Sequence, residues 1–177
     1  PPVANDAEYL AALRERYGER ADEIARTYPA SAFATPQDAL ERVLGDGGLV
    51  CGTYDSARRV AAAGGRVWLY DFARWVQIPE LQPLDLRALH GAEIAYVFGS
   101  PPPPTEDDAA LSDAIQGYWT RLARDGDPNG DGAVVWPRYD DTSDQRLNLD
   151  VPITVVTRFR RTECEMWWRF YDEDFAS

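Results

Sequence analysis

Apolar side chains recur at helical spacing along much of this chain. The first such face predicts an amphipathic helix over residues 6–17, where Tyr9, Leu10, Leu13 and Tyr17 fall three or four residues apart. The same periodicity, bounded by capping residues and by proline or glycine, predicts further helices over residues 19–28, 36–44, 48–63, 92–97, 106–124 and 161–171. Thr35 and Thr105 stand where two of these helices begin and are expected to act as N-caps.

Strand signals are fewer. Residues 66–72 (RVWLYDF) form a continuous apolar run rich in β-formers and predict a buried strand. Residues 146–149 and 153–157, joined by Asp150-Val151-Pro152, predict a hairpin at the edge of a sheet. The chain offers the buried strand no obvious sheet neighbour, so this set of elements is typical of the end of an α/β fold.

Composition narrows the class of protein. The 177 residues fit one domain or a large part of one, and no stretch approaches the roughly 18 apolar residues of a membrane span. A net charge of −12 argues against nucleic acid as a partner, because phosphate binding needs a basic surface. All 18 basic residues are arginine, which we interpret as codon use in a GC-rich genome rather than as phosphate or carboxylate recognition.

The first residues resemble no targeting segment. The chain begins Pro1-Pro2-Val3, with no initiating methionine, basic region or apolar region of a signal peptide. We therefore expect that a leader was removed or that the sequence starts inside a longer protein.

His90, the only histidine, is the first candidate for chemistry. It follows a proline-containing stretch after a predicted strand, which is where α/β enzymes place catalytic groups, and an imidazole can exchange protons near neutral pH. Glu93 lies one helical turn on and could orient it. From the residues alone, a structural histidine bonded to backbone and a solvated glutamate remain open alternatives.

Other candidate sites are weaker. Residues 125–131 (DGDPNGD) resemble the first half of a calcium loop, but the twelfth position is Trp136 where a bidentate glutamate is required, so we interpret them as a polar turn. Cys51 and Cys164 could be a disulfide or two buried thiols, and their spacing does not decide. Without a zinc-ligand set, phosphate loop or dinucleotide fingerprint, we expect no metal or cofactor.

Four segments together resemble a known family. They are LHGAEIAYVFG (89–99), AAAGGRVWLYDF (61–72), YW…GDPNG…WPRY (118–139) and RTECEMW (161–167). Their order and spacing from residue 8 to 171 resemble the last third of type B carboxylesterases, the cholinesterase-like and para-nitrobenzyl-esterase-like α/β-hydrolases.

The resemblance implies a fold and a role for His90. The fold is the C-terminal part of an α/β-hydrolase, a three-layer sandwich with a mostly parallel sheet flanked by helices, and residues 1–177 would form part of that single domain. His90 would be the general base to a serine nucleophile and then the general acid to the leaving alcohol. Glu93 matches a glutamate that lies near the histidine without being the triad acid. Leu89 and Ala92 would flank the substrate pocket.

The resemblance also implies a disulfide between Cys51 and Cys164, hence an oxidising compartment, and we interpret the chain as part of a secreted bacterial esterase that is extracellular or periplasmic. No Gly-x-Ser-x-Gly occurs in the sequence, and the expected serine and acid lie upstream of residue 1. We therefore expect an N-terminal partner chain of the same esterase and a small ester substrate, with no nucleic acid or membrane as partner. The alternatives are a non-catalytic cholinesterase-like binding module and an inactive fragment.

Overall fold

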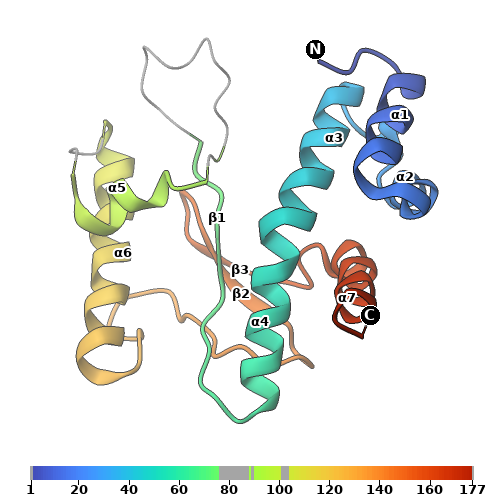
Figure 1. Cartoon of the computed structure of the whole chain (residues 1–177). Coiled ribbons are helices and arrows are strands. Elements are labelled where there is room, and N and C mark those ends of the chain that lie inside the picture. Colours follow the sequence, from blue (N-terminus) through green and yellow to red (C-terminus); the bar gives the residue numbers. More distant parts are fainter. Residues whose placement is uncertain (1, 76–87, 89, 101–103, 177) are drawn as a thin grey trace. The chain divides into compact units, whose positions relative to one another are not determined.

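The computed structural model describes residues 2–75, 88, 90–100 and 104–176. The chain divides into two compact units. We call residues 1–56 with 160–177 the helical unit, and residues 57–159 the sheet unit. Figure 1 traces both along the sequence.

Helices build the whole of the helical unit. They are α1 (Asp6–Tyr17), α2 (Ala21–Thr27), α3 (Pro36–Gly45), the first part of α4 (Cys51–Ala62) and α7 (Arg161–Ala176), with 3-10 turns at Gly18–Arg20 and Ala30–Ala32. The expected caps are present, since Thr35 accepts a hydrogen bond from the Asp38 amide at the start of α3. The helices predicted over 6–17 and 36–44 are confirmed within a residue.

A π-helical turn, Asp46–Val50, joins α3 to α4 without a break. The sequence predicted two separate helices, over 36–44 and 48–63, and predicted neither their continuous connection nor its wider winding. Gly47 in the turn lies against the indole of Trp167, so the absence of a side chain lets α7 approach closely.

A small mixed sheet lies in the sheet unit. Its order is β1-β2-β3, formed by β1 (Tyr70–Phe72), β2 (Gln145–Leu149) and β3 (Thr154–Thr157). β2 and β3 pair antiparallel, which confirms the predicted hairpin. β1 runs parallel to β2, with Tyr70 opposite Leu147, so β2 is the neighbour that the sequence did not reveal.

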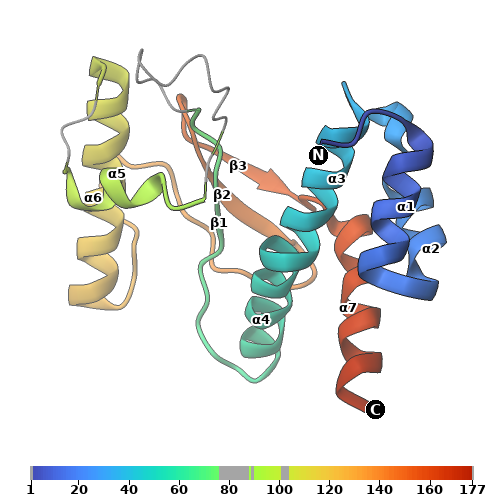
Figure 2. The same ribbon diagram turned by 45° about the horizontal axis from the view of Figure 1, so that its top comes forward.

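One face of this sheet is covered by α5 (Glu93–Phe98) and α6 (Glu106–Asp125), which lie side by side in Figures 1 and 2. Their apolar faces meet alternate residues of the strands, as the two-residue period of a strand requires. The buried cluster consists of Tyr96, Leu111, Ile115, Tyr118, Trp136, Leu147 and Leu149.

Two sequence-based expectations need correction. The buried strand predicted over 66–72 is a strand only at Tyr70–Phe72, and these residues are half-buried because β1 is the outer strand of the sheet. The final helix was expected to end at residue 171 but continues to Ala176.

Most of the proline-containing stretch between the predicted strand and His90 lies outside the described residues, as do residues 101–103. No helix in the described part of the chain combines the length and the apolar character needed to cross a membrane.

Candidate active site

His90 lies on an exposed turn immediately before α5. The next residue, Gly91, has φ +88°, a backbone conformation that side chains disfavour, and its carbonyl accepts the Ile94 amide at 3.2 Å. The turn therefore leads directly into the helix, and the imidazole stands in the open rather than within the core.

The other residues predicted for this site lie around the same turn. Glu93 is the first residue of α5 and is half-buried. The pKa of Tyr70 on β1 is raised first by the burial of Tyr70 itself and second by the negative charge of Glu93. Ala92 is half-buried just before the helix. Leu89 lies outside the described residues. Glu93 is thus close enough to β1 for its charge to act on Tyr70, whereas His90 is exposed.

A buried carboxylate, Asp108, is hydrogen-bonded to the helix that follows this turn, α5. It is 0% exposed and stands in the first turn of α6. One oxygen, Oδ1, accepts Arg74 Nε at 2.7 Å and the Tyr96 hydroxyl at 2.9 Å. The other, Oδ2, accepts the Thr105 hydroxyl at 2.5 Å, while the Asp108 amide donates back to Thr105 Oγ1 at 3.0 Å.

These contacts decide the charge state of Asp108. Burial alone would raise the pKa of its carboxyl group, but hydrogen bonds from Arg74, Thr105 and Tyr96 outweigh burial and hold the pKa below its usual value. Burial, followed by the hydrogen bond to Asp108, raises the pKa of Tyr96 to about 12. At neutral pH the cluster is therefore an ionised carboxylate held by a guanidinium and two neutral hydroxyls.

The sequence analysis did not identify Asp108 as part of a site, since an acidic residue in the first turn of a helix is ordinary there. The signal that could have distinguished it is its place on the helix, because residues 108, 111, 115 and 118 follow the three- and four-residue spacing of the apolar face. An aspartate on such a face must find hydrogen-bond donors when it is buried.

Cys51 and Cys164 form a disulfide, which confirms the pairing implied by the resemblance. Their Cα atoms are 5.0 Å apart, and the bond joins α4 to α7 inside the helical unit. The Trp168 indole donates to the Cys51 carbonyl at 2.9 Å and helps to bury the bond.

A polar cluster lies under the π-helical turn of the helical unit. Buried Asp46 pairs with Arg160 and accepts the Tyr28 hydroxyl at 3.1 Å, and that hydroxyl in turn accepts the Trp167 indole N–H at 3.0 Å. Burial, then the charge of Asp46, raises the pKa of Tyr28. This cluster satisfies buried polar groups and fixes α7 to the turn, which is a structural role.

The loop after α6 is a polar turn, as expected. Asn129 closes it, because its side-chain oxygen accepts the Trp136 amide at 2.7 Å and its nitrogen donates to Asp127 at 2.9 Å. Within the described residues, the structure has no group of three or more His, Cys, Asp or Glu side chains that could hold a metal ion.

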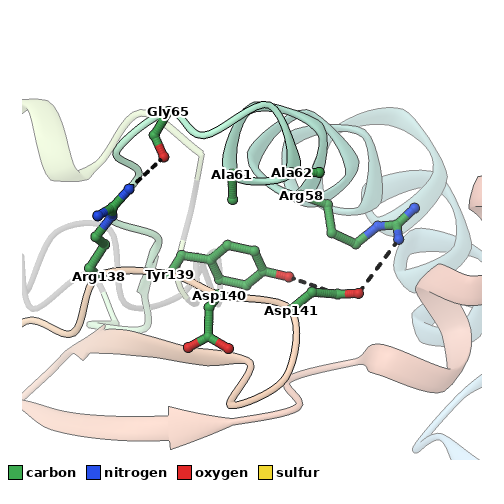
Figure 3. Close-up of a pocket in the computed structure, with 8 residues that line it drawn as sticks. All are labelled: Arg58, Ala61, Ala62, Gly65, Arg138, Tyr139, Asp140 and Asp141. Carbon is green, nitrogen blue, oxygen red and sulfur yellow. Dashed lines mark hydrogen bonds and ion pairs between the residues drawn. The ribbon is translucent and has the colours of Figure 1, made fainter.

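A shallow hollow of about 500 Å³ opens elsewhere on the sheet unit (Figure 3). It is lined by Arg58, Ala61, Ala62, Gly65, Arg138, Tyr139, Asp140 and Asp141. Its polar groups largely engage one another: Tyr139 donates to Asp141 at 3.2 Å, and Arg138 donates to the Gly65 carbonyl at 3.1 Å. None of the residues predicted for catalysis lines it, so we do not place the active site there.

Comparison with known proteins gives one consistent result. The model of the carboxylesterase family matches residues 3–167. A medium-chain fatty acyl-CoA hydrolase precursor from Anas platyrhynchos is 33% identical over 144 residues, covering 79% of this chain and 26% of that protein. Acetylcholinesterase from Gallus gallus is 34% identical over 149 residues, covering 76% of this chain and 18% of that protein.

Carboxylesterase 5A from Felis catus is 33% identical over 141 residues, covering 74% of this chain and 26% of that protein. The chain thus spans about a quarter or less of the length of these relatives. All three are vertebrate proteins, so they give no support to the bacterial origin expected from the composition.

Proposed function

The chain belongs to the carboxylesterase family, as its motifs predicted, and we propose that it supplies the catalytic histidine of an enzyme that hydrolyses carboxylic esters. The observation that carries the proposal is the placement of His90: the only histidine stands exposed on the turn before α5, within the segment matched by the family. An imidazole that must reach a serine on another segment needs this accessibility.

In the proposed reaction, the imidazole of His90 removes the proton from a serine hydroxyl as its oxygen attacks the ester carbonyl. The imidazolium then gives that proton to the leaving alcohol, and an acyl-enzyme remains. Water repeats the sequence, again with His90 as base, and releases the acid. The serine, the oxyanion hole and the carboxylate that orients the imidazole would come from the N-terminal portion of the same esterase.

We propose that Glu93 helps to hold the orientation of the imidazole, because it is the first residue of α5 and stands three positions after His90 on the turn that leads into this helix. Ala92, together with Leu89, would face the substrate pocket. In this arrangement Glu93 contributes to orientation rather than to proton transfer, and its loss should cost much less than the loss of His90.

The N-terminal portion is proposed as the partner on structural grounds. β1 is the outer strand of the described sheet and runs parallel to β2. Parallel sheets are normally covered and extended on both sides, so a further strand beside β1 would complete the fold as a three-layer α/β-hydrolase. We call this chain together with that portion the completed esterase. Its disulfide supports an extracellular or other oxidising location.

The test is the substitution His90→Ala in the completed esterase, assayed with a nitrophenyl ester. Without the base, kcat should fall by a factor on the order of 10⁴–10⁶, while reversible binding of a substrate analogue changes little.

Glu93→Gln should lose far less activity, and Glu106→Gln, which changes an exposed glutamate at the start of α6, is the matched control. If the folded His90→Ala protein keeps more than a few per cent of the rate, His90 is not the base. A folded, completed protein with no activity before any substitution would instead favour the non-catalytic binding module.

A further inference from the structure

The strongest unassigned feature of the sheet unit is the buried carboxylate of Asp108, and its bonds reach both sides of the segment that carries His90. Arg74 stands two residues beyond the end of β1, and Tyr96 stands on α5 beyond His90. Both donate to the same oxygen of Asp108, at 2.7 and 2.9 Å. Residues 34 and 12 positions away in the sequence therefore meet at one buried atom.

This meeting point lies near the carboxyl ends of the parallel strands β1 and β2. β1 and β2 are parallel, so their carboxyl ends, Phe72 and Leu149, lie at the same edge, where α/β proteins bind substrate. The Ala73 amide donates to the Leu149 carbonyl at 3.1 Å, and Arg74 also lies 3.7 Å from Asp150, just after β2. Arg74 thus ties Asp108 to the ends of both strands.

The link from Asp108 to His90 runs through α5. Tyr96 is fixed at three points: its hydroxyl by Asp108, its carbonyl by the Ser112 hydroxyl at 2.8 Å, and its ring by Phe72 at 5.2 Å between centroids. The start of α5 is joined to the turn that carries His90 by the hydrogen bond from the Ile94 amide to the Gly91 carbonyl. A shift of Tyr96 would therefore shift the turn.

We infer that Asp108 is a positioning residue for His90: its buried carboxylate clamps Arg74 and Tyr96, on either side of the histidine segment, and so sets where the imidazole stands. The inference rests on the proposed function, because positioning has a catalytic effect only if His90 is the base. Catalysis is sensitive to such placement, since an error of about 1 Å can cost roughly 100-fold in rate.

Asp108→Asn tests the clamp with almost no change of shape. The amide has one acceptor oxygen where the carboxylate has two, so its NH₂ group would face a donor, and Arg74 would lose the charge of its buried partner at 2.7 Å. In the completed esterase, we expect kcat to fall roughly 10- to 100-fold with KM within about twofold of the original value. Asp107→Asn is the matched control, because Asp107 is the adjacent, exposed residue in the same first turn of α6.

A second pair of variants separates positioning from stability. Tyr96→Phe removes the hydroxyl that bonds Asp108, and Tyr118→Phe removes one that donates to the Val134 carbonyl at 2.6 Å in the same unit. Both should lower the melting temperature by similar amounts. Only Tyr96→Phe should lower kcat, by about three- to tenfold, and this loss should largely disappear in the Asp108→Asn background, because the two residues act through one bond.

The result that overturns the inference is an equal kcat for Tyr96→Phe and Tyr118→Phe, measured well below both melting temperatures. That result would leave the proposed function intact if His90→Ala is inactive. If His90→Ala is active, the proposed function fails first, and any effect of Asp108→Asn has another cause. Should Asp108→Asn fail to fold, the tyrosine pair still decides.

Discussion

Tyr9 in α1 has a buried hydroxyl group, and its ionisation should make the free energy of unfolding depend on pH. It is 3% exposed, and it donates to the Tyr28 carbonyl at 2.8 Å. Burial, and then the charge of Tyr17, raises the pKa of Tyr9 to about 12. In the unfolded chain a tyrosine ionises near pH 10, so the folded state holds its proton over a range in which the unfolded state has lost it.

The expected consequence is a loss of stability as pH rises above about 10, since a raised folded-state pKa stabilises only while the group stays protonated in both states. One such group lowers the free energy of unfolding by up to about 1.4 kcal/mol for each pH unit in this range. The measurement is the free energy of unfolding between pH 8 and 11. Tyr9→Phe should be less stable at pH 8 but should show a shallower decline, and parallel curves for the two proteins would contradict this account.

At the scale of elements, the π-helical turn offers a matched pair of glycines. A Cβ at position 47 would stand 2.6 Å from Trp167 Cη2, whereas at position 48 it would meet nothing within 4 Å. The Trp167 ring cannot easily move, because its N–H donates to the Tyr28 hydroxyl and the Tyr17 ring packs against it at 5.4 Å between centroids.

Gly47→Ala should therefore destabilise the protein by about 1–3 kcal/mol through overpacking. Gly48→Ala should be neutral or slightly stabilising, because the unfolded chain loses freedom without a new clash. Urea unfolding of both variants makes the comparison. A Gly47→Ala protein as stable as Gly48→Ala would show that α7 is not packed against this turn as described.

Elements specified by local signals were the ones that the sequence predicted well. The threonine caps fix where α3 and α6 begin, and Gly126 fixes where α6 ends, because capping involves only residues within one turn. The extent of β1 was predicted poorly, since a strand ends where its partner ends, and its partner β2 lies more than seventy residues on. The close approach of Trp167 to Gly47 in the π-helical turn is a tertiary contact, which no local pattern reveals.

At the scale of the whole molecule, the candidate site also has a part that the sequence predicted and a part that it did not. His90 and Glu93 were found because they are contiguous in a motif, and both lie at the turn before α5. The cluster around Asp108 was missed because its members come from three elements and only their folded arrangement joins them. Local sequence thus identifies the proposed base, whereas the groups that hold it in place appear only in the fold.

The disulfide closes a large covalent loop in the chain. Cys51 and Cys164 are both fully buried and are 113 residues apart in the sequence. In the chain-entropy model, closing a loop of this size restricts the unfolded state and stabilises the folded one by roughly 4–5 kcal/mol.

We expect the protein to show no alkylatable thiol by mass spectrometry until it is reduced, and to unfold at a distinctly lower temperature once it is. The Cys51→Ser/Cys164→Ser variant is the control, because it lacks the bond and its stability should not respond to reductant. Since both sulfur atoms lie in the helical unit, amide hydrogen exchange after reduction should accelerate there first. Two cysteines that react without prior reduction would contradict the prediction, and the proposed oxidising compartment would then lose its main support.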